Sequence, residues 1–201
     1  MKKFSVFIII IGLLVASYPL LEQAFTWYWQ QKLFKEWENI PIVEEQPEVE
    51  IILAEEDEEE EENTAFLSPT GPVLGILKIS KINLRVPVIQ GLNETNLKIG
   101  ISYLEDSAKI GEKGNTVLAG HRGRSYGRLF NRLNEMEVDD QIVISTDQGD
   151  YTYLVYKTVI VEPNDVSVLR TGREEKILTL VTCEPIRNPT HRLIVQAKQV
   201  N

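Results

Sequence analysis

Residues 176–198 read KILTLVTCEPIRNPTHRLIVQAK and predict two β-strands, Lys176–Cys183 and Arg192–Lys198, joined by a loop. Both runs are rich in Leu, Ile, Val and Thr, and the Pro and Asn residues between them are typical of turns. If the two strands pair as a hairpin, Cys183 and Arg192 face each other with their side chains on one face. A guanidinium in that place favours a thiolate, or donates hydrogen bonds to an oxyanion.

Short β-type runs of the same kind recur from Gly75 onward, without the strand–helix alternation of a doubly wound parallel sheet. The other predicted strands are Gly75–Ile79, Leu84–Ile89, Ile101–Leu104, Thr116–Gly120, Gln141–Thr146 and Tyr151–Val161, and the predicted helical pieces are Glu94–Ile99 and Arg128–Glu135. This pattern predicts an all-β fold, either a closed barrel or a sandwich. The long connections 162–175 and 184–190 are expected to be binding elements.

Charge is distributed unevenly along the chain of 201 residues. The net charge is −9, yet residues 1–62 hold 15 of the 30 acidic residues and 4 of the 21 basic ones. Residues 44–62 carry twelve acids, a run that repels itself and predicts a disordered linker, either a spacer from an anionic surface or simply a solvated connection. The sequence has no Lys/Arg run typical of nucleic-acid binding, and its single cysteine excludes an intramolecular disulfide framework and CxxC-type zinc or redox motifs.

The N-terminal residues predict a membrane anchor. Phe4–Leu21 contains no charged residue and would span about 27 Å as a helix, close to the hydrocarbon thickness of a bilayer. Lys2 and Lys3 precede it, so the positive-inside rule places the N-terminus in the cytoplasm and the rest of the chain outside. The alternative is a signal peptide with a poor cleavage site at residues 15–17. All three tryptophans, at positions 27, 29 and 37, follow the segment and suit an aromatic belt at the membrane surface.

Only two histidines can serve Cys183 as a base or acid. His121 directly follows the apolar run Thr116–Gly120, whereas His191 would point to the face opposite Arg192 in an extended strand. The position at a strand end favours His121. A buried structural cysteine remains the alternative at this point.

His121, Cys183 and Arg192, in this order, resemble the pattern of the sortases, the membrane-anchored cysteine transpeptidases of Gram-positive bacteria. The resemblance rests on the segment LAGHR at residues 118–122, on TLVTC at residues 179–183 (the family's TLxTC), and on an arginine nine residues later. It covers about residues 74–200, beginning with GILKI at residues 75–79.

The resemblance implies an eight-stranded β-barrel with short helices that cleaves an LPXTG-like sorting signal of surface proteins. Cys183 would attack the Thr carbonyl to form a thioacyl-enzyme, and His121 would protonate the departing amine and then activate the incoming one. Arg192 would hold the substrate and steady the oxyanion, and Thr182 would orient Arg192 or donate to the oxyanion. The acceptor would be an amine of the peptidoglycan precursor or cross-bridge, and neither a metal nor an organic cofactor takes part.

Two further expectations follow from the resemblance. The chain ends after its last predicted strand without a second hydrophobic span, as in single-anchor sortases of class D or class A. Some class A members bind calcium, and Glu105, Asp106, Glu112 and Glu174 could imitate such a site, although scattered loop acids explain them more simply. Arg122, Arg124 and Arg128 are rivals of Arg192 for contact with substrate or anion, or else belong to a solvated loop.

We therefore expect an anchor at residues 1–22, an aromatic segment and acidic linker at 23–73, and a sortase catalytic domain at 74–201 outside the cytoplasmic membrane. Two alternatives stay open. A thiol hydrolase or protease would use the same residues with water as the acceptor, since both reactions share the acyl-enzyme step. A non-catalytic membrane-tethered β-module would keep Cys183 as a structural residue.

Overall fold

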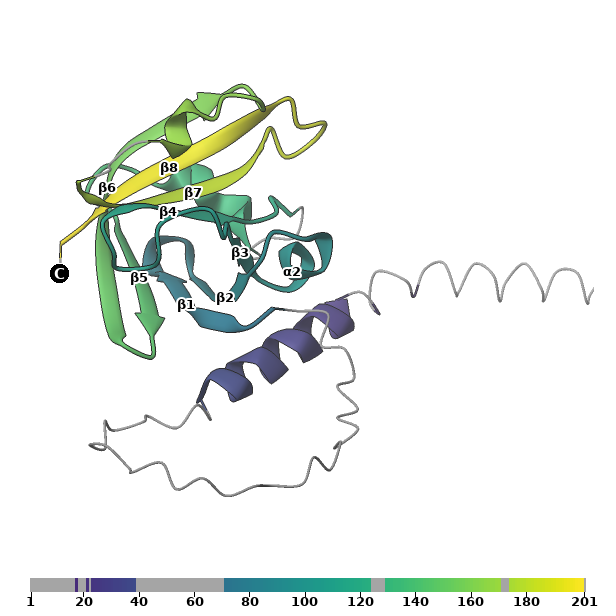
Figure 1. Cartoon of the computed structure of the whole chain (residues 1–201). Coiled ribbons are helices and arrows are strands. Elements are labelled where there is room, and N and C mark those ends of the chain that lie inside the picture. The colour runs from purple at the N-terminus through teal and green to yellow at the C-terminus, as the bar shows by residue number, and fades with distance from the viewer. Residues whose placement is uncertain are drawn as a thin grey trace, which may run out of the picture.

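The computed structural model describes residues 17, 21, 23–38, 71–123, 129–170 and 174–200 (Figure 1). Most of the charge-free segment 4–21, the whole acidic segment 44–62 and the two arginines Arg124 and Arg128 lie outside the described residues. Within the part of the chain that is described, no helix is long and apolar enough to cross a membrane.

Eight strands close into a barrel in the order β1-β2-β3-β4-β7-β8-β6-β5, which confirms the barrel over the sandwich (Figure 1). The strands are β1 (Val73–Ile79), β2 (Leu84–Gln90), β3 (Ile101–Tyr103), β4 (Gly114–Ala119), β5 (Gln141–Thr146), β6 (Gly149–Val161), β7 (Lys176–Glu184) and β8 (His191–Gln199). The helical pieces between them are η1 (Ser80–Ile82), α2 (Glu94–Ile99), η2 (Phe130–Glu135) and η3 (Ser167–Leu169). The predicted helix at Arg128–Glu135 is a 3-10 helix in its described part.

Strand alternation separates the barrel interior from its outer face. Leu178 and Leu180 of β7 are completely buried and belong to the main core cluster, together with Leu193, Val195 and Ala197 of β8. Because successive side chains point to opposite faces, the odd-numbered residues of β7, which include Cys183, lie on the outer face. The thiol is therefore half-buried on the outside of the wall and does not belong to the core.

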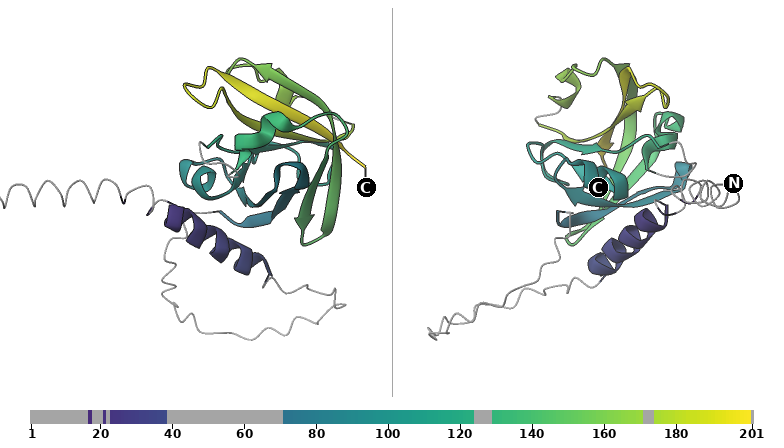
Figure 2. Two further views of the ribbon diagram at one scale, coloured as in Figure 1. Left: turned by 180° about the vertical axis from the view of Figure 1, so that it is seen from behind. Right: turned by 90° about the vertical axis from the view of Figure 1, so that its right-hand side faces the viewer.

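A helix over residues 23–38 lies outside the barrel wall, along β1, β2 and α2 (Figures 1 and 2). Leu33 is only 1% exposed, because it packs with Ile89 and Ile99 in a second apolar cluster that Trp29 joins. Gln30 Nε2 also donates to the carbonyl oxygen of Ile99 at 2.9 Å.

The tryptophans of this helix are divided between its two sides. Trp29 packs against the barrel, whereas Trp27 and Tyr28 are 65% and 60% exposed. At the C-terminal end of the helix, the Arg85 guanidinium lies 4.3 Å from the centre of the Phe34 ring, a cation–π distance. A single aromatic belt at the membrane therefore does not account for the whole segment, because part of it contacts the barrel.

Candidate active site

Cys183 and Arg192 are paired residues of the antiparallel β7–β8 ladder. The register runs without a bulge from Ile177 opposite Lys198 to Glu184 opposite His191, so the hairpin expected from the sequence is confirmed. Directly opposite residues in such a ladder carry their side chains on the same face. The side chains of Cys183 and Arg192 therefore start from neighbouring positions on the outer face of the barrel.

His121 reaches the same place through a different strand. β4 runs parallel to β7 with Ala119 opposite Val181, so the residue two positions beyond each of these is His121 and Cys183. The pairing continues past the end of β4, since the Gly120 amide donates to the carbonyl oxygen of Val181 at 3.1 Å. The imidazole, the thiol and the guanidinium therefore come from adjacent strand ends.

Gly120 is required where β4 ends because no side chain fits there. A Cβ atom at this position would lie 2.5 Å from Ile101 Cδ1 and 2.7 Å from Phe130 Cδ2. The Phe130 amide donates to the carbonyl oxygen of His121 at 3.1 Å, which fixes the backbone on the other side. The small residue before the histidine thus lets the chain pass closely over two core side chains.

The surroundings of His121 favour its neutral form. Removal of water by the surrounding protein is the main cause that lowers the pKa of the imidazole, and the positive charge of Lys98 lowers the pKa further. Glu94 acts in the opposite direction. Both residues belong to α2, so this short helix supplies the charges that tune the histidine.

Arg122 and Glu184, the residues after His121 and Cys183, form an ion pair. Arg122 Nη1 also donates to the carbonyl oxygen of Cys183 at 3.3 Å. The Arg122 side chain is only 5% exposed, and burial lowers the pKa of its guanidinium while the charge of Cys183 acts to raise it. Arg122 is therefore buried beside the thiol and is not part of a solvated loop.

An apolar hollow of about 150 Å³ adjoins Arg192 on the outer face. Its floor comes from three neighbouring strands, with Ala119 of β4, Val181 of β7 and Ile194 of β8. The connection after β6 supplies the opposite wall through residues that include Val166 and Leu169. A hollow of this kind suits an extended peptide with apolar side chains.

Buried polar side chains hold this connection on the barrel. Asn115 Nδ2 donates to the carbonyl oxygen of Leu169 at 3.0 Å, and Gln196 Nε2 donates to that of Val168 at 2.9 Å. The hydroxyl of Thr179 donates to Asn115 Oδ1 at 2.7 Å and links the two strands beneath. The network fixes the wall of the hollow because each of these groups has a partner away from water.

Two further residues considered from the sequence, Thr182 and His191, lie close to the three strand-end residues. The Thr182 hydroxyl is buried and donates to the carbonyl oxygen of Gly120 at 2.7 Å, so in this structure it connects β7 to the residue before His121. Its predicted contact with substrate or Arg192 stays a prediction. His191 is exposed and lies opposite Glu184 in the register, one position away from Arg192.

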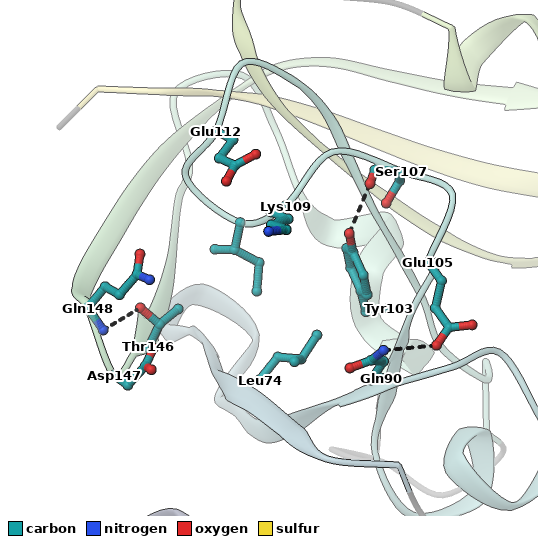
Figure 3. Close-up of a pocket in the computed structure, with 11 residues that line it drawn as sticks. Leu74, Gln90, Tyr103, Glu105, Ser107, Lys109, Glu112, Thr146, Asp147 and Gln148 are labelled. Carbon is teal, nitrogen blue, oxygen red and sulfur yellow. Dashed lines mark hydrogen bonds between the residues drawn. The ribbon is translucent and has the colours of Figure 1, made fainter. Parts of the chain in front are cut away.

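The acidic residues considered for calcium are spread over the surface. Glu105 and Glu112 line a cavity of about 430 Å³ together with Asp147, and they lie on different sides of it (Figure 3). Glu105 accepts a hydrogen bond from Gln90 Nε2 at 3.0 Å, and Glu174 lies 3.6 Å from Lys113 Nζ. Among the described residues, no group of three or more His, Cys, Asp or Glu side chains could hold a metal ion.

The sequence reasoning missed Glu184 and the polar network of Asn115, Thr179 and Gln196. Glu184 could have been found from the parallel pairing of β4 with β7. Residues at equal distances beyond a paired position lie side by side, so the residues that follow His121 and Cys183 are neighbours. The network carries no such local signal, since its members are polar residues on three strands that meet only after the barrel closes.

A barrel with a thiol, an imidazole and a guanidinium at adjacent strand ends defines a cysteine acyl-transfer enzyme. The sortase domain model matches residues 77–200. Over 99% of its length the chain is 31% identical to Sortase D of Bacillus subtilis, 98% of which is covered. A sortase D5 transpeptidase of Clostridium perfringens superimposes with a TM-score of 0.60 at 30% identity, over 65% of this chain and 81% of that one.

Sortase C1 of Streptococcus agalactiae superimposes with a TM-score of 0.62 at 34% identity, over 69% of this chain and 72% of that chain. The chain belongs to the sortase family and is a cysteine transpeptidase.

Proposed function

We propose that the enzyme cleaves an LPXTG-like sorting signal and transfers the surface protein that bears it to a cell-wall amine. Cys183 Sγ attacks the Thr carbonyl carbon, the peptide bond to the next residue breaks, and the departing amine takes a proton from His121. The resulting thioester is attacked by the amine of a peptidoglycan precursor or cross-bridge, which releases Cys183. The proton lost by the incoming amine returns to His121, so the cycle balances without a metal or organic cofactor.

One observation carries this proposal. Cys183 is paired with Arg192 on β8, and His121 lies two residues beyond the end of β4, the strand on the other side of β7. In this proposal Arg192 donates to the oxyanion that forms when the thiolate attacks, a role that preorganised donors fill in acyl transfer. The hollow beside Arg192 is apolar, which fits the Leu and Pro side chains of such a signal. Donation from Thr182 to the oxyanion would require its hydroxyl to give up the hydrogen bond to Gly120.

The competing proposal is hydrolysis, in which water takes the place of the amine. The decisive experiment incubates the purified chain with an LPXTG-like peptide and a graded concentration of an amine acceptor, and measures both products by chromatography. Transpeptidation predicts that the amide product rises with acceptor concentration at the expense of free acid. Free acid alone, at every acceptor concentration, would establish the hydrolase. A Cys183→Ala variant is the control for both products.

We also propose that Phe4–Leu21 anchors the chain as a single-pass segment with the N-terminus in the cytoplasm. Helix 23–38 starts two residues beyond this segment and packs on the barrel through Leu33, so this helix would keep the barrel close to the membrane. Alkaline carbonate extraction of membranes tests the anchor, because an integral protein stays in the pellet.

Class D is the subclass that we propose. The identity of 31% to Sortase D of Bacillus subtilis over nearly the whole of both chains supports it, compared with 24% to Sortase A of Listeria monocytogenes. Comparing rates with sorting signals that differ after the Thr residue tests this assignment, since it asks which signal the enzyme prefers.

A further inference from the structure

Two bridges between the ends of β4 and β7 bracket the proposed catalytic pair. Before the pair, the Thr182 hydroxyl donates to the carbonyl oxygen of Gly120 at 2.7 Å. After it, Arg122 donates to the carbonyl oxygen of Cys183 at 3.3 Å and forms an ion pair with Glu184. Each bridge therefore joins a residue next to the histidine with the cysteine itself or a residue next to it.

In the second bridge, between Arg122 and Glu184, the arginine side chain is buried. The side chain of Arg122 is 5% exposed, and its Nε has no hydrogen-bond partner in the described part of the chain. Glu184 is 22% exposed and supplies the compensating carboxylate. A buried guanidinium is costly unless it is paired, and its planar fork fixes the direction as well as the distance of its partners.

The backbone at this place needs such a tie. β4 ends at Ala119, its last hydrogen bond to β7 is made by Gly120, and beyond it Arg122 forms only an isolated bridge with Leu129. The position of His121 is therefore not set by a continuing strand ladder on the Cys183 side. Proton transfer demands hydrogen-bond distances, and a misplacement of about 1 Å can cost about 100-fold in rate.

We propose that Arg122 is a positioning residue, whose link to Glu184 and to the Cys183 carbonyl sets the separation of the imidazole and the thiol. The inference rests on the proposed transpeptidation, because it concerns the proton that His121 exchanges with the amines. The proposed role requires no contact of Arg122 with the sorting signal or the oxyanion. Arg122 acts through His121 and Cys183, so its loss should reduce turnover without weakening substrate binding.

The test uses the variants Arg122→Gln, Glu184→Gln and the double variant of the full chain, with an LPXTG-like peptide as substrate. We expect each single variant to lower kcat by about 10- to 100-fold while KM stays within about twofold. The double variant removes both charges and leaves two amides, so we expect it to lose less than the product of the two single losses. Arg122→Lys keeps the charge but not the fork and should recover only part of the rate.

A matched control is Arg132→Gln. Arg132 also pairs with a glutamate, Glu135, and donates to a main-chain carbonyl, that of Ile82 at 3.0 Å. This variant should lower the melting temperature as Arg122→Gln does, but leave kcat unchanged. If Arg122→Gln does not fold, Glu184→Gln carries the comparison, because it changes only the partly exposed partner.

A second readout is independent of turnover. The chain has two histidines, so the two imidazole NMR signals are readily assigned. Capping Cys183 with methyl methanethiosulfonate should shift the His121 signal in the wild type, and this shift should fall by at least half in Arg122→Gln. An unchanged shift would overturn the proposal, as would a higher KM at unchanged kcat or a kcat equal to that of Arg132→Gln.

The two readouts separate this inference from the proposed function. If the wild type forms no acyl-enzyme with any sorting peptide, the proposed transpeptidation of such signals is wrong. The NMR shift then decides alone whether Arg122 sets the separation of His121 and Cys183.

Discussion

Cys183 and Arg192 lie directly opposite each other in the β7–β8 ladder, so strand pairing and not a loop brings the two side chains to neighbouring positions on one face. A donor held on a strand beside the nucleophile is the kind of preorganised group that stabilises charge as it develops on a substrate carbonyl. Arg192 Nη1 is at the same time held by the carbonyl oxygen of His191 at 3.1 Å.

Replacing Arg192 tests this role. We expect Arg192→Ala to lower kcat/KM for the sorting peptide by about 100- to 1,000-fold, the loss typical for removal of an oxyanion donor. Arg192→Lys retains the charge but lacks the planar fork of donors, so its kcat/KM should lie between those of the wild type and of Arg192→Ala. Steady-state kinetics measures both, and activity of Arg192→Ala within threefold of the wild type would show that the guanidinium is not used.

The charges on α2 should move the pH dependence of the rate in opposite directions. Lys98→Gln removes a positive charge that lowers the pKa of His121, so the pKa rises. The imidazolium needed to protonate the departing amine then persists to higher pH, and the alkaline limb of the pH–kcat profile moves to higher pH. Glu94→Gln removes a charge that raises the pKa of His121, so it should move the same limb to lower pH.

Profiles between pH 5 and 10 at low salt give the clearest comparison, because salt screens both charges. Shifts of the same sign in the two variants would contradict the assignment of His121 as the acid.

Loosening the wall of the hollow should weaken substrate binding. Gln196→Leu removes the hydrogen bond from this amide to the carbonyl oxygen of Val168 and with it one of the ties that hold the wall on the barrel. We expect KM for the peptide to rise about three- to tenfold, with a smaller change in kcat. Tyr156→Phe is the matched control, since it removes the bond to the other end of the same amide, Gln196 Oε1, at 3.2 Å. Equal kinetic effects in both variants would contradict the role of the wall.

A side chain at position 120 should disturb the histidine. Gly120→Ala places a Cβ atom within 2.5 Å of Ile101 Cδ1, and overpacking of this kind costs about 1–3 kcal/mol. We expect a lower melting temperature and a lower kcat. Adding Ile101→Val removes the nearest clashing atom and should restore part of both. No recovery in the double variant, measured by calorimetry and kinetics, would show that this contact is not the cause.

Much of the fold follows from local sequence patterns. The Leu, Ile, Val and Thr residues of Lys176–Cys183 and Arg192–Lys198 predict both strands, and pairing the strands as a hairpin predicts that Cys183 and Arg192 share a face. The structure confirms the register between them. Asn93, which accepts from the Asn96 amide at 2.8 Å, caps α2 directly before Glu94, the residue where the predicted helix begins.

The remaining features depend on contacts between distant segments. The burial of Arg122 depends on Glu184, which lies 62 residues away and comes close only because β4 and β7 are parallel. The docking of helix 23–38 on Ile89 and Ile99 is likewise not visible in its sequence, because an amphipathic helix can cover a barrel as well as a membrane.

Mass spectrometry of the intact chain after incubation with an LPXTG-like peptide, with and without an amine acceptor, tests the central claim most directly. Our account predicts an added mass equal to the peptide's acyl part, located on Cys183 by proteolytic mapping, absent in Cys183→Ala and discharged when the amine is added. An enzyme that turns over the peptide while Cys183 stays unmodified, or that remains active as Cys183→Ala, would contradict the account.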